Sequence, residues 1–191
     1  MSAASAGDVN ADGYSDLIVG AAGWNDLYET EGKAFLYLGS PSGVPSDPSV
    51  SIGNPEHDPG GYFGQSVGVA GDVDGDGYAD VVVGAPQQGD GGCAFLYAGG
   101  PTGLAASPSA RLEDPEALGG GMGWSVSSAG DVNGDGYADV IVGAWGRDAG
   151  ALDEGGAFVF LGGPSGIDPI PTVILDNPDN QVGGEFGASV L

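Results

Sequence analysis

The apolar residues of this 191-residue chain fall into short runs separated by stretches rich in glycine, proline and aspartate. Val81–Val83 and Ala94–Tyr97 are typical runs. Glycine or proline interrupts almost every window long enough for a helix, and both residues are unfavourable inside helices. The pattern therefore predicts an all-β fold of many short strands joined by tight turns.

The same pattern occurs three times. Residues 6–21 recur as residues 70–85 and 129–144, and each copy is followed by a second apolar run that ends in glycine (33–39, 93–99 and 157–162). A Pro-x-Gly turn comes next (41–43, 101–103 and 164–166), and then a third strand-like stretch (49–54, 110–114 and 172–177). A stretch resembling Phe-Gly-x-Ser-Val begins at residues 63, 122 and 186. Four short strands per repeat predict one four-stranded antiparallel sheet each, which is typical of β-propeller blades.

The repeats divide the chain into blade 1 (1–62), blade 2 (63–121), blade 3 (122–185) and the opening strand of an incomplete further blade (186–191). Blade 1 lacks a Phe-Gly stretch, so its first strand is either missing or supplied by a C-terminal strand; Ser2–Ser5 align with Ser125–Ser128 as a small-residue substitute. Three blades do not close a propeller. We therefore expect a homodimer, a six-bladed ring in which two copies exchange strand 186–191. A ring of three chains and an open fragment of a longer propeller are the alternatives.

A nine-residue acidic loop follows the first strand of each repeat, with the form Asp-x-(Asp/Asn)-x-Asp-Gly-Tyr-x-Asp. Ca²⁺ takes six to eight oxygen ligands, which side chains at loop positions 1, 3, 5 and 9 and the carbonyl of position 7 can supply, while glycine at position 6 permits the bend. The predicted ligands are Asp8, Asn10, Asp12, Tyr14 and Asp16; Asp72, Asp74, Asp76, Tyr78 and Asp80; and Asp131, Asn133, Asp135, Tyr137 and Asp139. The sequence thus predicts three Ca²⁺ ions per chain, each acting as a structural clip.

Three other interpretations of the loop are weaker. An EF-hand needs a glutamate at position 12 and flanking helices, whereas position 12 is Val19, Val83 or Val142 within an apolar run. Mg²⁺ prefers fewer protein ligands and more water. An ordinary Asp/Asn/Gly turn does not explain three copies that keep every oxygen donor at the same spacing.

The charge is strongly negative, with 27 acidic residues, three basic residues and a net charge of −24. Such a field disfavours nucleic acid and anionic membrane surfaces as partners. No apolar stretch is long enough for a membrane helix, so no membrane insertion is expected, and no signal peptide precedes the first repeat. The single cysteine, Cys93, is interpreted as a buried, inert thiol.

The name-giving residues of a known family stand in the second repeat. Phe63-Gly64, followed by Gly84-Ala85-Pro86 with the acidic loop between them, resembles the FG-GAP repeat of integrin α-subunit propellers. The other copies are degenerate: Met122-Gly123 with Gly143-Ala144-Trp145, and Gly20-Ala21-Ala22. The resemblance implies calcium loops on one face of the propeller, ligands on the opposite face, an adhesive role, and an extracellular or cell-surface location of the parent protein.

No catalytic motif is recognisable, so the chain is not expected to be an enzyme. Glu113, Asp114 and Glu116 are interpreted as a solvated acidic turn, and the three tryptophans as packing residues. The favoured function is a calcium-binding scaffold that binds a protein or glycan. The alternatives are a non-catalytic propeller segment of a secreted enzyme and a designed or excised repeat array.

Overall fold

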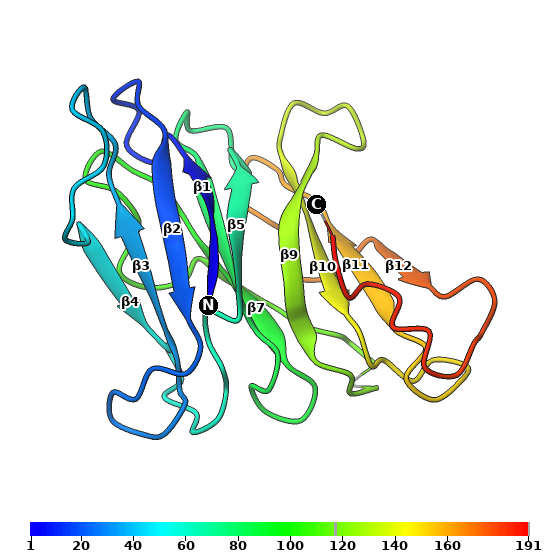
Figure 1. The fold of residues 1–191 in the computed structure, drawn as a ribbon. Helices are drawn as coiled ribbons and strands as arrows, with labels where there is room; N and C mark the ends of the chain where they lie inside the picture. Colours follow the sequence, from blue (N-terminus) through cyan, green and yellow to red (C-terminus); the bar gives the residue numbers. More distant parts are fainter. Residues whose placement is uncertain (117, 191) are drawn as a thin grey trace.

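The computed structural model describes residues 1–116 and 118–190, and they form three four-stranded antiparallel sheets (Figure 1). The first sheet contains β1 (Ser2–Gly7), β2 (Asp16–Ala21), β3 (Lys33–Tyr37) and β4 (Val50–Gly53). The second contains β5 (Ser66–Gly71), β6 (Asp80–Ala85), β7 (Cys93–Tyr97) and β8 (Ala110–Leu112). The third contains β9 (Met122–Gly130), β10 (Asp139–Ala144), β11 (Gly156–Phe160) and β12 (Val173–Asp176). The predicted all-β fold with three four-stranded blades is confirmed.

Each sheet is a meander whose strands pair in sequence order. The first strands β1, β5 and β9 lie side by side, and the sheets fan out from them as propeller blades do (Figure 1). Val19, Val83 and Val142 lie inside β2, β6 and β10, which excludes an EF-hand at the acidic loops. None of the described residues forms a helix, so none forms a helix capable of crossing a membrane.

Two hydrophobic cores fill the junctions between neighbouring blades. Because successive side chains of a strand point to opposite faces, Val81 and Val83 of β6 face the first blade while Val82 faces the third. Blade 2 is therefore covered on both sides, and every residue of β6 and β7 is buried. This explains why these strands are continuous apolar runs, whereas an alternating pattern marks a sheet with one solvated face.

The Phe-Gly stretches connect one blade to the next. Phe63 forms a bridge with Gly32, and the Gly64 carbonyl lies so close to Gly20 that an added Cβ there would come within 2.1 Å of its oxygen. The Ser2 hydroxyl donates to the same carbonyl. Equivalent contacts hold residues 122–123 on the second blade and 186–187 on the third. The Gly residues of both halves of the repeat thus allow two backbones to touch.

The segments at both ends of the described chain lie on the chain's own blades. β1 pairs with β2 and fills the first position of the first sheet, as the alignment of Ser2–Ser5 with Ser125–Ser128 predicts. The described part of the 186–191 segment lies on the chain's own third blade, where Phe186 bridges Gly155. Residue 191 lies outside the described residues.

Candidate metal centre

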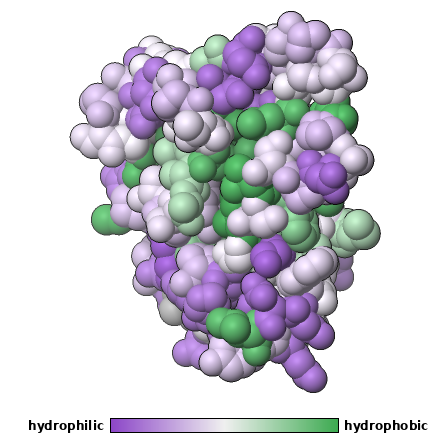
Figure 2. All heavy atoms as spheres, turned by 90° about the vertical axis from the view of Figure 1, so that its left-hand side faces the viewer, coloured by the Kyte–Doolittle hydropathy of each residue, from purple (hydrophilic) through white to green (hydrophobic). Residues whose placement is uncertain are grey.

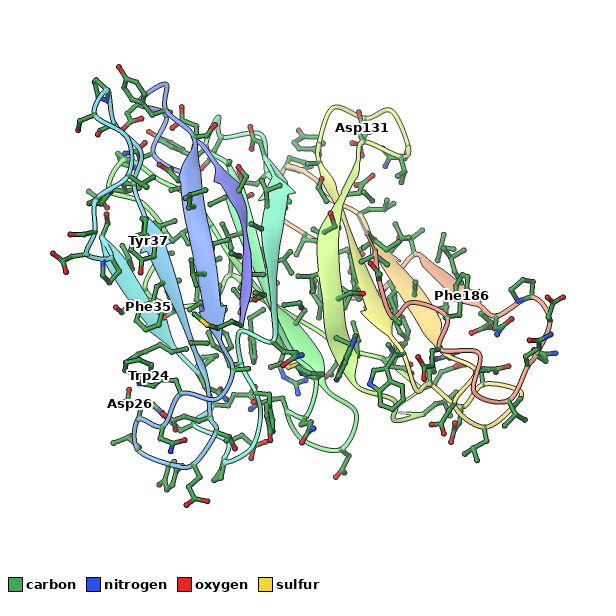
Figure 3. The ribbon with its side chains drawn as sticks, in the orientation of Figure 1. Trp24, Asp26, Phe35, Tyr37, Asp131 and Phe186 are labelled. Atoms are coloured by element: carbon green, nitrogen blue, oxygen red, sulfur yellow. The ribbon has the colours of Figure 1, made fainter. Side chains whose placement is uncertain are left out.

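The three acidic loops connect β1 to β2, β5 to β6 and β9 to β10, so all lie at the same end of the blades. Figure 3 labels Asp131 in the third loop and Trp24 and Asp26 at the opposite end of the first blade. The fold therefore separates an acidic face from a second face built from the β2–β3, β6–β7 and β10–β11 connections.

The first aspartate of each loop holds the turn together. The Asp72 carboxylate accepts hydrogen bonds from the backbone N–H groups of Gly75, Asp76 and Gly77, at 2.7–3.1 Å. Asp131 accepts the equivalent three hydrogen bonds, and Asp8 accepts two of them. Side chains at positions 3 and 5 accept further hydrogen bonds from N–H groups two residues ahead. All three loops therefore share one conformation, set by local side-chain to backbone hydrogen bonds.

The last aspartate of each loop is buried and has a structural role that the spacing alone does not reveal. In blade 2, the Asp80 carboxylate accepts hydrogen bonds from Val73 N–H at 2.9 Å and from Gly99 N–H at 2.8 Å. Asp16 and Asp139 receive the equivalent pair. Each therefore ties its loop to the turn that follows the third strand of the same blade.

The second loop brings three carboxylates together. Ligand oxygens of Asp72, Asp74 and Asp80 lie within 4.8 Å of one another, which matches oxygens placed about 2.4 Å from a shared Ca²⁺ ion. Burial, together with the smaller effect of the charges of Asp74 and Asp76, raises the pKa of Asp80 to about 6, although two backbone hydrogen bonds oppose this rise. Burial also raises the pKa of Asp74. This centre lacks a positive charge, and its oxygen-only donor set fits a hard cation.

The first and third loops carry one carboxylate fewer. Asn10 and Asn133 replace Asp74, and each amide donates from Nδ2 to the carboxylate of the aspartate two residues ahead, at 3.0 and 2.8 Å. Among the described residues, the group of three acidic ligands occurs only in the second loop. The three loops share a backbone but differ in charge.

The loops also connect neighbouring blades. The Asp8 carbonyl accepts a hydrogen bond from Ala79 N–H in the second loop at 3.1 Å, and the Asp72 carbonyl accepts one from Ala138 N–H in the third at 3.0 Å. The next carbonyl along, in Val9, accepts from Gly100 N–H at 2.9 Å. The ring of Tyr137 lies against Gly75 of the preceding loop, so this tyrosine side chain also packs across the junction.

The acidic turn predicted to be solvated is exposed at Glu113 and Glu116, but Asp114 is buried and belongs to an ion cluster around Arg147. Arg147 has a side chain only 1% exposed, and its Nε donates to Asp114, which is buried, at 3.0 Å. Its other nitrogens pair with Glu116 and Asp176, and its guanidinium lies 5.4 Å from the Phe158 ring centroid. The prediction failed because the cation that neutralises the turn is supplied 33 residues later by the next blade.

A cleft of about 360 Å³ lies between blades 2 and 3 at the end opposite the acidic loops. The rings of Trp124 and Trp145 line it with centroids 5.5 Å apart, and Asp148 and Asp153 add carboxylates. Trp124 packs against Trp145, as a packing residue would, yet it remains 38% exposed.

The sequence of the chain matches the family model "FG-GAP repeat" over residues 2–37, 63–100 and 122–160, which is more than half of its length. It is similar to integrin alpha-4 of Xenopus laevis, with 36% identity over 151 residues that cover 77% of this chain and 14% of the relative. Human integrin alpha-7 is 40% identical over 142 residues, 72% of this chain and 11% of the relative. Rat integrin alpha-7 is 37% identical over 175 residues, 90% of this chain and 15% of the relative. The chain thus spans about a seventh of the length of these relatives or less. Each of the three matched segments covers the first three strands of one four-stranded sheet, and the chain belongs to the FG-GAP repeat family, with integrin α subunits among its relatives.

Proposed function

We propose that this chain is a non-catalytic, Ca²⁺-stabilised propeller scaffold of an adhesion type, acting outside the cell or at its surface. Three Ca²⁺ ions would be held by the loop residues predicted from the sequence. The observation that carries the proposal is the pair of hydrogen bonds by which the loop carbonyls of Asp8 and Asp72 reach the next blade. A cation that orders a loop then also orders the junction beside it.

The physical role of Ca²⁺ would be to neutralise carboxylates that the fold holds together. Without a cation, Asp72, Asp74 and Asp80 repel one another, and folding must overcome that repulsion. Binding to the folded state alone stabilises it by RT ln(1 + [Ca²⁺]/Kd), about 2.7 kcal/mol at a hundredfold excess over Kd. The ion is thus a clip within each loop and a brace between blades.

Thermal unfolding in Ca²⁺, in Mg²⁺ and in EGTA tests the clip, together with a calcium titration that counts the bound ions. We expect three ions per chain and a melting temperature that falls markedly in EGTA. Asp74→Asn should weaken one of the three sites, whereas Asn10→Asp should strengthen another, because each change moves a loop toward the charge of its counterpart. Equal melting temperatures in Ca²⁺ and EGTA would sink the proposal.

The binding face would lie at the end opposite the loops, at the Trp124–Trp145 cleft. Exposed tryptophan rings beside carboxylates suit stacking and hydrogen bonding with a sugar, or contact with a basic side chain of a protein. Glycan and peptide arrays probed with the calcium-loaded chain test this role. Binding should be lost in Trp124→Ala and kept in Trp24→Ala, which removes an exposed tryptophan from another blade. Binding that survives the loss of Trp124 would place the ligand elsewhere.

A further inference from the structure

The third acidic loop contains the one asparagine of the sequence that glycine follows, Asn133-Gly134. An asparagine side chain loses ammonia when the backbone nitrogen of the next residue attacks its Cγ, and a side chain on that next residue hinders the attack. Glycine has no Cβ, whereas proline has no N–H to lose. The other asparagines precede proline or a residue with a side chain: Asn54 and Asn177 in the first case, and Asn10, Asn25 and Asn180 in the second.

The first loop provides a matched comparison for Asn133. Asn10 occupies the same loop position, and both amides donate from Nδ2 to the aspartate two residues ahead, at 3.0 and 2.8 Å. Both Oδ1 atoms accept the backbone N–H of that aspartate, at 3.2 and 3.0 Å. The following residues, Ala11 and Gly134, have positive φ of 55° and 76°. At this step the two loops therefore differ by one methyl group.

The hydrogen bonds of the third loop hold the reacting groups of Asn133 and Gly134 apart. The carboxamide of Asn133 is engaged with Asp135, and the N–H of Gly134 donates to Oδ1 of Asp131, the labelled residue in Figure 3, at 2.7 Å. Ring closure requires the carboxamide to leave Asp135 and turn back toward the Gly134 nitrogen. The Asp131 carboxylate already accepts the N–H whose proton must leave, so it is placed to receive that proton.

A cation in the loop would block both steps. Asp131, Asn133 and Asp135 stand at loop positions 1, 3 and 5, whose oxygens are the predicted Ca²⁺ ligands. A bound ion would fix the Asn133 side chain by its oxygen and neutralise the Asp131 carboxylate. We propose that Asn133 is a deamidation site that reacts while the third loop is empty and is protected when Ca²⁺ fills it, a control that rests on the proposed function.

The reaction needs only water. The Gly134 nitrogen bonds to Cγ of Asn133, the bond from Cγ to Nδ2 breaks, and ammonia leaves with the proton that the Gly134 nitrogen gives up. Water then opens the resulting succinimide ring at either carbonyl. Asn133 and Gly134 are exposed, so water reaches the ring. Figure 2 views the molecule across the first blade and shows hydrophilic atoms at the end that carries the acidic loops, with apolar atoms gathered below them.

The two products have opposite effects on the loop. Opening at one carbonyl gives aspartate, so the third loop acquires the carboxylate that Asp74 supplies to the second. Opening at the other gives isoaspartate, which inserts a methylene into the backbone. That insertion shifts the N–H groups that donate to Asp131, those of residues 134–136. We therefore expect the aspartate form to bind Ca²⁺ more tightly in this loop, and the isoaspartate form to lose one ion from the titration.

Mass spectrometry of tryptic peptide 112–147 tests the site. The whole chain is incubated in Ca²⁺ and in EGTA at mildly alkaline pH, at a temperature at which circular dichroism shows both forms folded. Asn133 should convert in EGTA. Since only the empty loop reacts, conversion should be about a hundredfold slower at a hundredfold excess of Ca²⁺ over Kd. No conversion in EGTA would overturn the proposal. Equal rates with three ions bound would contradict the protection alone, whereas a titration that finds no bound ion would contradict the proposed function as well.

Exchanging the residues that follow the two asparagines tests the chemistry. Ala11→Gly should make Asn10 reactive in EGTA, as seen in peptide 1–33, and Gly134→Ala should stop the reaction at Asn133. Both changes leave every predicted ligand in place, and each copies a residue that the other loop already holds at positive φ. Conversion of Asn133 at the wild-type rate in Gly134→Ala would show that ring closure on residue 134 is not the reaction.

Emptying one loop at a time tests the protection without a chelator. Asp135→Ala removes a ligand from the third loop, and Asp76→Ala removes the equivalent ligand from the second. In saturating Ca²⁺, Asn133 should convert in the first variant and stay intact in the second. Similar rates in both variants would mean that the protection does not come from the ion in the third loop, and the proposed control would be wrong.

Discussion

The two internal blade junctions share one backbone arrangement but differ in chemistry. At the first, Asn54 Nδ2 donates to Gln88 Oε1 at 2.9 Å. At the second, Arg147 Nε donates to Asp114 Oδ2 at 3.0 Å. A neutral amide pair and a buried ion pair thus occupy the same place.

The surrounding hydrogen bonds show how close the equivalence is. Gln88 and Arg147 each accept a backbone N–H through their carbonyls, from Gly92 and Gly155, both at 3.1 Å. Asn54 and Asp114 each accept the N–H of the residue two positions ahead, at 3.0 and 2.9 Å. At this position, the two junctions differ in their side chains and share these backbone hydrogen bonds.

This difference shows how a repeat protein can specify which of its blades contact each other. If Asp114 met Gln88 rather than Arg147, a buried carboxylate would keep its charge without a cation, whereas the amide pair tolerates such changes better. Different pairs at matching positions therefore disfavour wrong blade contacts. The comparison also ranks the junctions by how much each loses when one partner is removed.

The largest effect is expected from Arg147→Met. The change leaves Asp114, whose side chain is 2% exposed, charged and without a cation, and it removes the guanidinium from the Phe158 ring. Breaking a buried ion pair from one side costs about 3–5 kcal/mol. Urea unfolding in saturating Ca²⁺ measures the loss.

The double variant Asp114→Asn with Arg147→Gln is the control for that prediction. It copies the amide pair of the first junction into the second, so it should recover most of the lost stability. If the double variant is as unstable as the sum of its two single changes, the junctions are not interchangeable and the comparison fails.

A second prediction concerns what the junctions have in common, the close approach of backbone. An added Cβ at Gly7 would lie 2.6 Å from Cβ of Ala79, and one at Gly71 would lie 2.5 Å from Cβ of Ala138. Both glycines have positive φ, as does Gly130, where nothing lies within 4 Å.

Alanine at Gly130 should therefore cost only the backbone strain, about 1–2 kcal/mol. Alanine at Gly7 or Gly71 should cost about 1–3 kcal/mol more, because it also forces the blades apart. Thermal unfolding of the three variants gives the order. If all three variants lose the same stability, the junctions accommodate the added methyl groups at Gly7 and Gly71 without strain.

A smaller effect is expected from Gln88→Ala. The change removes the hydrogen bonds of Gln88 to Asn54 and Glu56, but it strands no charge, and Asn54 keeps its bond to the Glu31 carbonyl. The expected loss is about 1–3 kcal/mol. Gln87→Ala, at the exposed neighbouring residue, should leave the urea midpoint unchanged. A loss as large as that of Arg147→Met would contradict the ranking.

Local patterns predicted the fold and the loops, and contacts between blades account for what they missed. The acidic loops could be located because their residues are adjacent in the sequence and repeat three times. Asp114 was misjudged because its partner, Arg147, comes from the next blade and stands where the other repeats have Gln88 and Trp24. Short-range patterns cannot reveal such a pair. The repeat alignment would have shown the substitution, although not what it contacts.

The smallest expected effect is a change in the rate at which Cys93 is alkylated, and this rate distinguishes the two junctions. Cys93 is fully buried in the core between blades 1 and 2, and burial raises the pKa of its thiol to about 12. At pH 8 the thiol of the folded protein is neutral and inaccessible, so iodoacetamide should react only when this junction opens.

Gly7→Ala and Gln88→Ala, which loosen the first junction, should speed the labelling under native conditions. Gly71→Ala, which loosens the second, should speed it less, even at equal global stability. Mass spectrometry of the alkylated chain follows the reaction. Equal labelling rates in the Gly7 and Gly71 variants would show that the two junctions open together, as one cooperative unit.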